Sequence, residues 1–317
     1  MNTPSKTLDV ITVGEAMVLF AAQQVGPLDD ASSFARTTAG AEFNVAIGLA
    51  RLGLRVGYLS RLGQDLFGRH IADVLAREGI DRQQVAMDAD HPTGFMLKSR
   101  SDDGSDPQIQ YFRKGSAASH MQASELASDC CTRARHLHLT GIFVGVTPST
   151  RELVFELAQR ARAAGLSISF DPNLRPTLWR SKDEMVDCLN QLSTFSDWVL
   201  PGIEEGRLLT GRDSVQGIAD FYLARGAQGV VVKLGPQGAF FATPQGSGHV
   251  VGAPVARVVD TVGAGDGFAV GVISGLLEGL PLAAAAARGN AIGARVVQFP
   301  GDADGLPTRA ELNALHA

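Results

Sequence analysis

Short β-branched segments alternate with helical patterns over most of this 317-residue chain, and this alternation limits the possible folds more than any other feature. The strand-like segments include DVITVG, RVGYLSRLG, HLHLTG, LSISFD, DWVLPG and GVVVKLG. Between them lie segments with helical spacing, capping residues or terminal glycines, as at residues 65–79, at residues 149–164 and from Ser181 onwards. Because such alternation is typical of βαβ units, we predict an α/β three-layer sandwich with a mainly parallel central sheet.

Two regions interrupt the alternation, at about residues 16–38 and 92–115. They contain strand-like pieces and a DDGSDP turn, but no helical pattern. We expect them to form a small antiparallel sheet that stands off the main one, within a single domain of residues 1–317. Ligands bind at the carboxyl ends of the strands in open α/β sheets, so this small sheet would cover such a site as a lid.

Composition and charge exclude several classes of protein. A net charge of -5 and a pI near 5.8 offer no basic footprint for nucleic acid or an anionic membrane. Cys130, Cys131 and Cys188 lack the paired spacing of a disulfide framework or a zinc site, which fits a reducing compartment. The amino terminus lacks a signal-peptide pattern, and the longest apolar stretch, residues 267–277, is too short to span a bilayer. We therefore expect a cytoplasmic protein that binds neither nucleic acid nor membranes.

The segment VGAGD places Gly263, Ala264 and Gly265 directly before Asp266, at the start of an almost wholly apolar helix. A helix amino terminus has free N–H groups and a partial positive charge, so it attracts phosphate, and small residues let the anion approach closely. A carboxylate there would repel the anion unless it has another task. General-base catalysis is such a task, since phosphoryl transfer needs a group to accept the proton of the attacking hydroxyl. The alternative is that Asp266 only caps the helix.

Two stretches of the chain resemble the signatures of the ribokinase-like (PfkB) carbohydrate kinase family. DTVGAGDGFAVGVI is similar to that family's carboxy-terminal signature, and AGAEFNVAIGLARLG, running into SRLGQDLFG, is similar to its amino-terminal one. They lie more than half of the chain apart in the family's order, so together they are far more specific than either alone. The resemblance implies a ribokinase-like fold with a β-sheet lid, an anion hole at residues 263–266, and Asp266 as the catalytic base.

Two further stretches, QYFRKGSA and DPNLRPTLW, resemble the 2-keto-3-deoxygluconate kinases of this family, whose substrate is a sugar acid. Arginine binds a carboxylate through paired charge-assisted hydrogen bonds, each worth about 1.5–3 kcal/mol, which a neutral sugar would not use. The alternative for Arg113 is a charged, solvated edge strand, and the alternative for Arg175 is an ion pair with Asp171. The resemblance implies that Arg113 and Arg175 lie near the substrate carboxylate, within a set of substrate contacts that comprises Gly40, Asn44, Tyr111, Arg113, Arg175 and Asp266.

On the nucleotide side, VVVKLGPQGAFF resembles the family's strand and glycine turn near the ATP phosphates, and RGNAIGARVV resembles its adenine-side helix. The resemblance implies ATP and Mg²⁺ as cofactors, allows a monovalent cation, and assigns nucleotide contacts to Lys233, Gly235, Gly238, Gly263, Gly265 and Asn290. Gly-Pro-Gln-Gly is also an ordinary hairpin turn, and the alternative for Asn290 is a buried structural amide. The family's Asn-x-x-Glu aligns with residues 202–205, where Glu205 is a candidate magnesium ligand but Gly202 replaces the asparagine.

The sequence therefore predicts an ATP-dependent kinase that phosphorylates the terminal (6-) hydroxyl of 2-keto-3-deoxygluconate, the position that the resemblance implies. The first alternative is a kinase for a neutral sugar such as fructose or ribose. The missing asparagine suggests a second, a sugar-acid-binding protein without activity. A nucleotide-dependent dehydrogenase is the third, and it is disfavoured because no GxGxxG follows the first strand.

Two further expectations concern assembly and a possible metal site. Lid strands often pair between subunits in this family, so we expect a homo-oligomer. His136 and His138 share one side of a strand, but the sequence offers no third ligand beside them, so we expect both to be structural.

Overall fold

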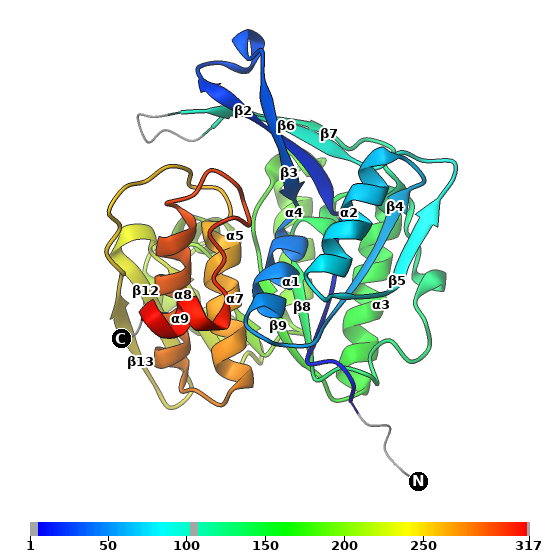
Figure 1. Ribbon diagram of the computed structural model, residues 1–317. Helices are drawn as coiled ribbons and strands as arrows, with labels where there is room; N and C mark the ends of the chain where they lie inside the picture. The colour runs from blue at the N-terminus through cyan, green and yellow to red at the C-terminus, as the bar shows by residue number, and fades with distance from the viewer. Residues whose placement is uncertain (1–5, 102–106, 316–317) are drawn as a thin grey trace.

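A nine-stranded sheet forms the centre of the computed structural model, which describes residues 6–101 and 107–315 (Figure 1). The strand order is β13-β12-β11-β10-β9-β8-β1-β4-β5, and every neighbouring pair from β11 through β5 is parallel. Among the described strands of this sheet, the only antiparallel pairs are β11 with β12 and β12 with β13. The strands are β1 (Val10–Val13), β4 (Val56–Gly63), β5 (Asp81–Asp88), β8 (His136–Thr140), β9 (Ser167–Asp171), β10 (Trp198–Val199), β11 (Gly229–Lys233), β12 (Gly238–Thr243) and β13 (Gly246–Val251).

Helices cover both faces of this sheet, which confirms the predicted three-layer sandwich. Successive residues of a strand point to opposite faces, so Val10 packs in one apolar cluster and Ile11 in the other. Figure 1 shows α1, α2, α7 and α8 on the side nearer the viewer. That face carries α1 (Ala41–Arg51), α2 (Leu66–Arg77), α7 (Ala264–Leu277), α8 (Leu282–Val296) and α9 (Arg309–Leu315). The other carries α3 (Pro148–Ala163), α4 (Lys182–Ser193), α5 (Ile203–Thr210) and α6 (Val215–Leu223).

The helix boundaries follow the capping signals in the sequence. Asp65 and Ser181 precede α2 and α4, and each side chain accepts a hydrogen bond from a backbone N–H of the first turn. Helix α3 begins one residue earlier than predicted, because Thr147 caps it and Pro148 occupies its first position. Strand β5 was not among the predicted strands, since its sequence DRQQVAMD is mostly polar. Within the described residues, the longest apolar helices fall short of the length needed to cross a membrane.

Short 3₁₀ helices lie in several of the connections. They are η1 (Leu28–Asp30), η2 (Ala117–His120), η3 (Ala123–Glu125), η4 (Phe143–Gly145), η5 (Pro176–Leu178) and η6 (Gly235–Gln237). Of these, η5 and η6 follow β9 and β11 and therefore lie near the carboxyl edge of the main sheet. The functional residues predicted after these strands are consequently brought to one edge.

A second sheet stands above that edge and forms the lid (Figure 1). Its described strands are β2 (Met17–Val25), β3 (Phe34–Ala39), β6 (Phe95–Arg100) and β7 (Ile109–Phe112), in the order β3-β2-β6-β7. The prediction of an antiparallel sheet is wrong for β2 and β6, which pair in parallel. These strands are joined by a crossover that includes β4, α2 and β5, whereas antiparallel neighbours need only a hairpin. The predicted DDGSDP turn lies, except for its proline, outside the described residues.

The two faces of the lid differ: the inner face, toward the main sheet, carries a mixture of polar and apolar side chains, and the outer face carries phenylalanines. Met96 and Tyr111 are cross-strand partners that both line the space beneath the lid, and Lys98 follows on the same face of β6. Phe95 and Phe112 are partners on the opposite face, where their rings stack with centroids 4.6 Å apart. The inner face of the lid therefore contributes side chains to any ligand held against the main sheet.

Candidate active site

The lid, the carboxyl ends of the main strands and the start of α7 enclose a cavity of about 490 Å³. Every residue predicted to contact the substrate lines it, namely Gly40, Asn44, Tyr111, Arg113, Arg175 and Asp266. Of the residues predicted for the anion hole, the nucleotide and the metal, the lining includes Gly263, Gly265, Lys233 and Glu205. Segments from both ends of the chain thus meet at one place, as the two separated signatures require.

The start of α7 has the geometry of an anion site. Gly263 precedes the helix with a φ of 84°, and a Cβ atom there would lie 2.4 Å from the backbone oxygen of Asp302. Glycine is therefore required both by the backbone conformation and by the close neighbour. Within the part of the chain that the structure describes, the backbone N–H groups of Gly265 and Asp266 have no protein acceptor. They are available to an anion in the cavity.

Asp266 occupies the third position of α7 and its carboxylate is held from outside the helix. Asn44 Nδ2 donates to Oδ2 at 2.8 Å and Asn173 Nδ2 donates to Oδ1 at 3.4 Å. Gly263, not Asp266, is the N-cap residue, so the helix-capping alternative does not describe this side chain. Burial raises the pKa of Asp266 to about 7, the Asn44 hydrogen bond opposes this, and the nearby charge of Asp171 adds to it.

Asn173 was not predicted, although it helps to hold the carboxylate of Asp266. Its φ of 38° makes it the only residue other than glycine, within residues 6–101 and 107–315, with a positive φ. Asparagine tolerates this left-handed conformation better than most residues, and the Asn173 N–H donates to Asp171 Oδ1 at 3.2 Å. The DPN sequence after β9 was the available signal. Strained backbone of this kind concentrates at functional sites.

The two predicted arginines differ in how much of their charge is already neutralised. Arg113 Nε and Nη2 contact Glu15 Oε2 at 2.7 and 2.5 Å, and the Arg113 side chain is 12% exposed, so it is not a solvated edge residue. Glu15 was missed because nothing in its local sequence indicates a partner 98 residues away. Arg175 Nη1 donates to the backbone oxygen of Leu174 at 2.9 Å and has no carboxylate partner within the described chain. The positive charge of Arg175 is therefore available to a ligand.

Asp171 pairs with Lys233 and not with Arg175. Lys233 Nζ lies 2.6 and 2.8 Å from the two carboxylate oxygens of Asp171. Burial would lower the pKa of Lys233, but the negative charges of Asp171 and Glu205 outweigh it and raise that pKa. A Cβ atom at Gly265 would lie 3.7 Å from Lys233 Nζ, so this ammonium lies directly beside the start of α7. Lys233 thus places an ammonium beside the anion site, with its charge partly balanced by Asp171.

Glu205 is engaged by the backbone of two loops. Its Oε2 accepts the N–H of Gly202 at 2.6 Å, and its Oε1 accepts the N–H of Leu174 at 2.8 Å. No group of three or more His, Cys, Asp or Glu side chains in the described part of the chain is arranged to hold a metal ion. The described side chains around Glu205 therefore do not surround a Mg²⁺ ion by themselves. This arrangement is compatible with a Mg²⁺ ion that is held mainly by phosphates and water.

The remaining nucleotide residues lie outside the cavity lining. Gly235 is the first residue of η6, and Gly238 follows η6 as the first residue of β12; a Cβ atom at Gly238 would lie 2.1 Å from the backbone oxygen of Val250. Asn290 Nδ2 donates to the backbone oxygens of Val250 and Val251 at 3.3 and 3.0 Å. These contacts support the alternatives in which the turn is a hairpin connection and Asn290 is a buried structural amide.

His136 and His138 are buried within the main sheet and bound to serines. His136 contacts Ser167 Oγ and Ser169 Oγ, both at 2.8 Å, and His138 Nδ1 contacts Ser169 Oγ at 2.9 Å. Burial lowers the pKa of His136 to about 4 and that of His138 to about 3, so both are neutral at pH 7. This arrangement supports the structural role expected for them.

Known proteins match this chain over nearly its whole length. The model of the pfkB family carbohydrate kinases matches residues 7–309. The 2-dehydro-3-deoxygluconokinase of Bacillus subtilis (strain 168) is 50% identical over 306 residues, which cover 96% of this chain and 94% of that protein.

Solved structures agree with the sequence relatives. The crystal structure of a PfkB protein from Polaromonas sp. JS666 has a TM-score of 0.90 and 54% identity, and covers 97% of this chain and 99% of that one. A candidate ribokinase II from E. coli, solved in complex with ATP and Mg²⁺, has a TM-score of 0.90 and 27% identity, with coverages of 98% and 99%. The fold, the two signatures and these matches agree: this chain belongs to the pfkB family of carbohydrate kinases.

Proposed function

We propose that this chain is an ATP-dependent 2-dehydro-3-deoxygluconokinase, which transfers the γ-phosphate to the 6-hydroxyl of 2-keto-3-deoxygluconate. The 50% identity to the Bacillus subtilis enzyme of that name supports the substrate. The observation that carries the proposal is the position of Asp266, a carboxylate at a helix amino terminus in the same cavity as the unpaired charge of Arg175. A general base, an anion site and a carboxylate-binding cation are thereby within reach of one ligand.

The sugar acid would bind beneath the lid, with its carboxylate toward Arg175. Arg113 offers only the donors that Glu15 leaves free, so its main effect is to fix the neighbouring wall of the cavity. Gly40 contributes to the cavity wall without a side chain, and its φ of 132° together with the Glu15 backbone oxygen, 2.5 Å from a hypothetical Cβ, requires glycine. Asn44 and Tyr111 supply polar groups for sugar hydroxyls.

In the transfer step, Asp266 accepts the proton of the 6-hydroxyl as that oxygen attacks the γ-phosphorus. The bond from the γ-phosphorus to the oxygen that bridges it to the β-phosphate breaks, and ADP leaves. A pKa of about 7 suits this task, because the carboxylate is both substantially ionised and basic enough near neutral pH. The N–H groups of Gly265 and Asp266 would stabilise the charge on the transferred group.

The nucleotide would place its phosphates against the start of α7 and Lys233, and the ATP and Mg²⁺ bound to the E. coli relative support both cofactors. Mg²⁺, held by the phosphates, would neutralise part of the polyphosphate charge. Lys233 keeps its proton because Asp171 stabilises the ammonium, so the protein provides positive charge at this point without moving a side chain.

A coupled ADP-release screen of ketodeoxy sugar acids against neutral hexoses and pentoses tests the proposal. We expect kcat/KM for 2-keto-3-deoxygluconate to exceed that for fructose or ribose by at least about 100-fold, since two charge-assisted bonds to a carboxylate distinguish them. Faster turnover of a neutral sugar would establish the first alternative instead. Failure to release ADP with every sugar acid and sugar would favour a binding protein without activity.

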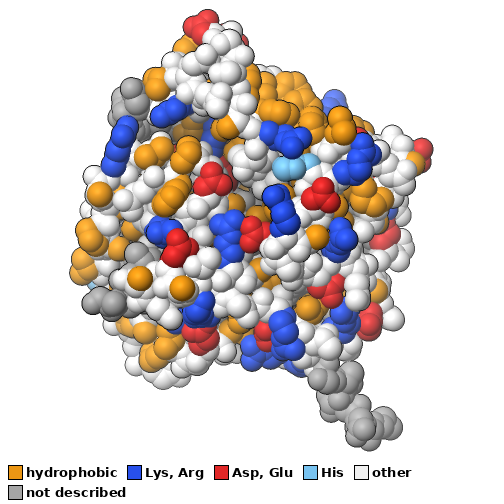
Figure 2. Space-filling model, in the orientation of Figure 1, with side chains coloured by type: hydrophobic (Ala, Val, Ile, Leu, Met, Phe, Trp, Pro, Cys, Tyr) orange, Lys and Arg blue, Asp and Glu red, His pale blue; other side chains and the backbone are white. Residues whose placement is uncertain are grey.

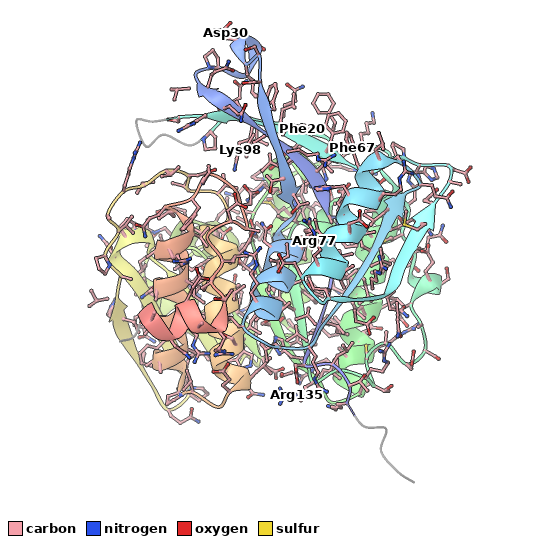
Figure 3. The ribbon with its side chains drawn as sticks, viewed as in Figure 1. Phe20, Asp30, Phe67, Arg77, Lys98 and Arg135 are labelled. Atoms are coloured by element: carbon pink, nitrogen blue, oxygen red, sulfur yellow. The ribbon has the colours of Figure 1, made fainter. Side chains whose placement is uncertain are left out.

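We also propose that the enzyme is a homo-oligomer that acts in the cytoplasm, where its three free cysteines stay reduced. The outer face of the lid supports assembly, because Phe112 of β7 is 44% exposed there, while Phe20 of β2 packs against Phe67 of α2 (Figure 3). Figure 2 shows hydrophobic side chains gathered over this end of the molecule. Analytical ultracentrifugation at micromolar concentration should give a mass of at least two chains, and a monomer would contradict the assembly.

A further inference from the structure

A lysine of the lid lies buried between two carboxylates that belong to the phosphate side of the cavity. Lys98, on the inner face of β6, is 2% exposed, and its Nζ lies 2.6 Å from both Asp260 Oδ2 and Asp302 Oδ1. Its side chain points from the lid toward the body of the protein in Figure 3. Burial would lower the pKa of Lys98, but Asp302 and Asp260 raise it, so the ammonium stays charged.

Both carboxylates belong to segments that shape the start of α7. Asp260 Oδ1 accepts the N–H of Val262 at 3.0 Å and so fixes the turn that precedes Gly263. The backbone oxygen of Asp302 packs so closely against Gly263 that a Cβ atom on Gly263 would lie only 2.4 Å from it. One ammonium therefore connects a lid strand to the two segments that hold the first residue of the anion hole.

The charges of this cluster make the connection specific. One ammonium lies between the buried carboxylate of Asp302 and the partly buried carboxylate of Asp260, and Asp302 also lines the active-site cavity. Without Lys98 the two negative charges would repel each other and repel any phosphate bound at α7. Their low-energy arrangement thus requires the lid strand to lie in its observed place.

We propose that Lys98 is a positioning residue for phosphoryl transfer, which fixes the anion-hole loop in its active geometry only when the lid lies over the cavity. The inference rests on the proposed kinase function but not on the identity of the sugar. A second cavity of about 400 Å³, lined by Lys98 and Asp260 among others, adjoins the cluster. Small cations from solvent can therefore reach the two carboxylates if the lysine is shortened.

The test uses Lys98→Ala and n-propylammonium, which together contain the atoms of the missing side chain. We expect Lys98→Ala to lower kcat by up to about 100-fold, as misplacement of catalytic groups does, with a much smaller change in KM for the sugar. Propylammonium should raise the kcat of Lys98→Ala at least tenfold. Tetramethylammonium at equal ionic strength should not, because it has the charge but no N–H donor. Arg100→Ala is the matched control, since it removes a cation from the same strand without touching either carboxylate.

Three results would overturn the proposal. The first is a folded Lys98→Ala protein with wild-type kcat. The second is propylammonium that restores the thermal midpoint without restoring kcat, which would make Lys98 merely structural. The third is equal rescue by tetramethylammonium. If Lys98→Ala does not fold, Asp260→Asn is tested instead, because its amide oxygen can still accept the Val262 N–H. Its kcat should fall by roughly 2- to 30-fold. An unchanged kcat would contradict the proposal.

Hydrogen–deuterium exchange provides a readout that needs no turnover. Lys98→Ala should raise exchange in β6 and in residues 259–263 together, and propylammonium should lower both; a change confined to the lid would overturn the coupling. If the wild-type protein phosphorylates a neutral sugar, the substrate assignment fails while the same Lys98 comparison proceeds on that sugar. If it phosphorylates nothing, the proposed function fails and the exchange result still decides the coupling.

Discussion

The sugar side and the phosphate side of the cavity are built by different means. The sugar side consists of side chains from the lid and from loops after the sheet strands, and Arg175 supplies its available charge. The phosphate side consists of backbone N–H groups at the start of α7 and one lysine that is already paired with Asp171. In the proposed binding mode, substrate choice therefore depends on side-chain identity on the first side, whereas phosphate binding depends on backbone geometry on the second.

The largest effect is expected at Asp266, where the two sides meet. Asp266→Asn keeps the size of the side chain but cannot accept the hydroxyl proton, so kcat should fall by about 100- to 10,000-fold. The measurement is ADP release at saturating sugar and ATP, with circular dichroism to verify the fold. Turnover close to that of the wild type would contradict the assignment of Asp266 as the base.

Arg175→Ala should affect the sugar side alone. Loss of one or two charge-assisted bonds to the substrate carboxylate should raise KM for the sugar acid by about 10- to 100-fold, with KM for ATP unchanged. Arg180 is the matched control, because it is an exposed arginine five positions further along that does not line the cavity. An equal effect of Arg180→Ala, or unchanged kinetics in Arg175→Ala, would contradict the proposal that Arg175 binds the substrate carboxylate.

The pH profile tests the protonation of the base separately from its position. Burial raises the pKa of Asp266 to about 7, so the carboxyl group gains a proton as the pH falls below that value and cannot act as a base. The kcat/KM for the sugar, which reports the pKa values of the free enzyme, should therefore be about tenfold lower at pH 6 than at its plateau at pH 8 or above. The residual activity of Asp266→Asn should lack this dependence. A wild-type profile that stays flat down to pH 5 would be inconsistent with the raised pKa.

The smallest effect on kinetics is expected at Asn290, and it separates the two interpretations of the nucleotide side. Asn290→Ala removes donors to Val250 and Val251 from a residue outside the cavity lining, so KM for ATP should change by less than about twofold. The free energy of unfolding should fall by about 1–3 kcal/mol, because the two hydrogen bonds that the buried Asn290 amide donates to backbone carbonyls are lost. A large rise in KM for ATP with unchanged stability would instead support the adenine contact that the family resemblance implies.

Local patterns predicted the parallel sheet, most helix boundaries and the anion hole, because each of these depends on residues close together in the sequence. The carboxylate of Asp266 and its glycines are an example, since the whole motif spans a few positions. Glu15, Asn173 and Lys98 were not predicted, because their roles come from partners 93 to 204 residues away. The parallel pairing of β2 and β6 was missed for the same reason, since no turn signal joins them.

The hydrogen bond between Asn44 and Asp266 joins positions 222 residues apart, and this has a consequence for how the protein is made. A chain emerging from the ribosome can assemble the lid and most of the parallel strands before α7 has been translated. Such an unfinished chain has a wall for the sugar but no group to activate its hydroxyl. Translation products that stop before Asp266 therefore lack the proposed base, which is added only with about the last sixth of the 317 residues.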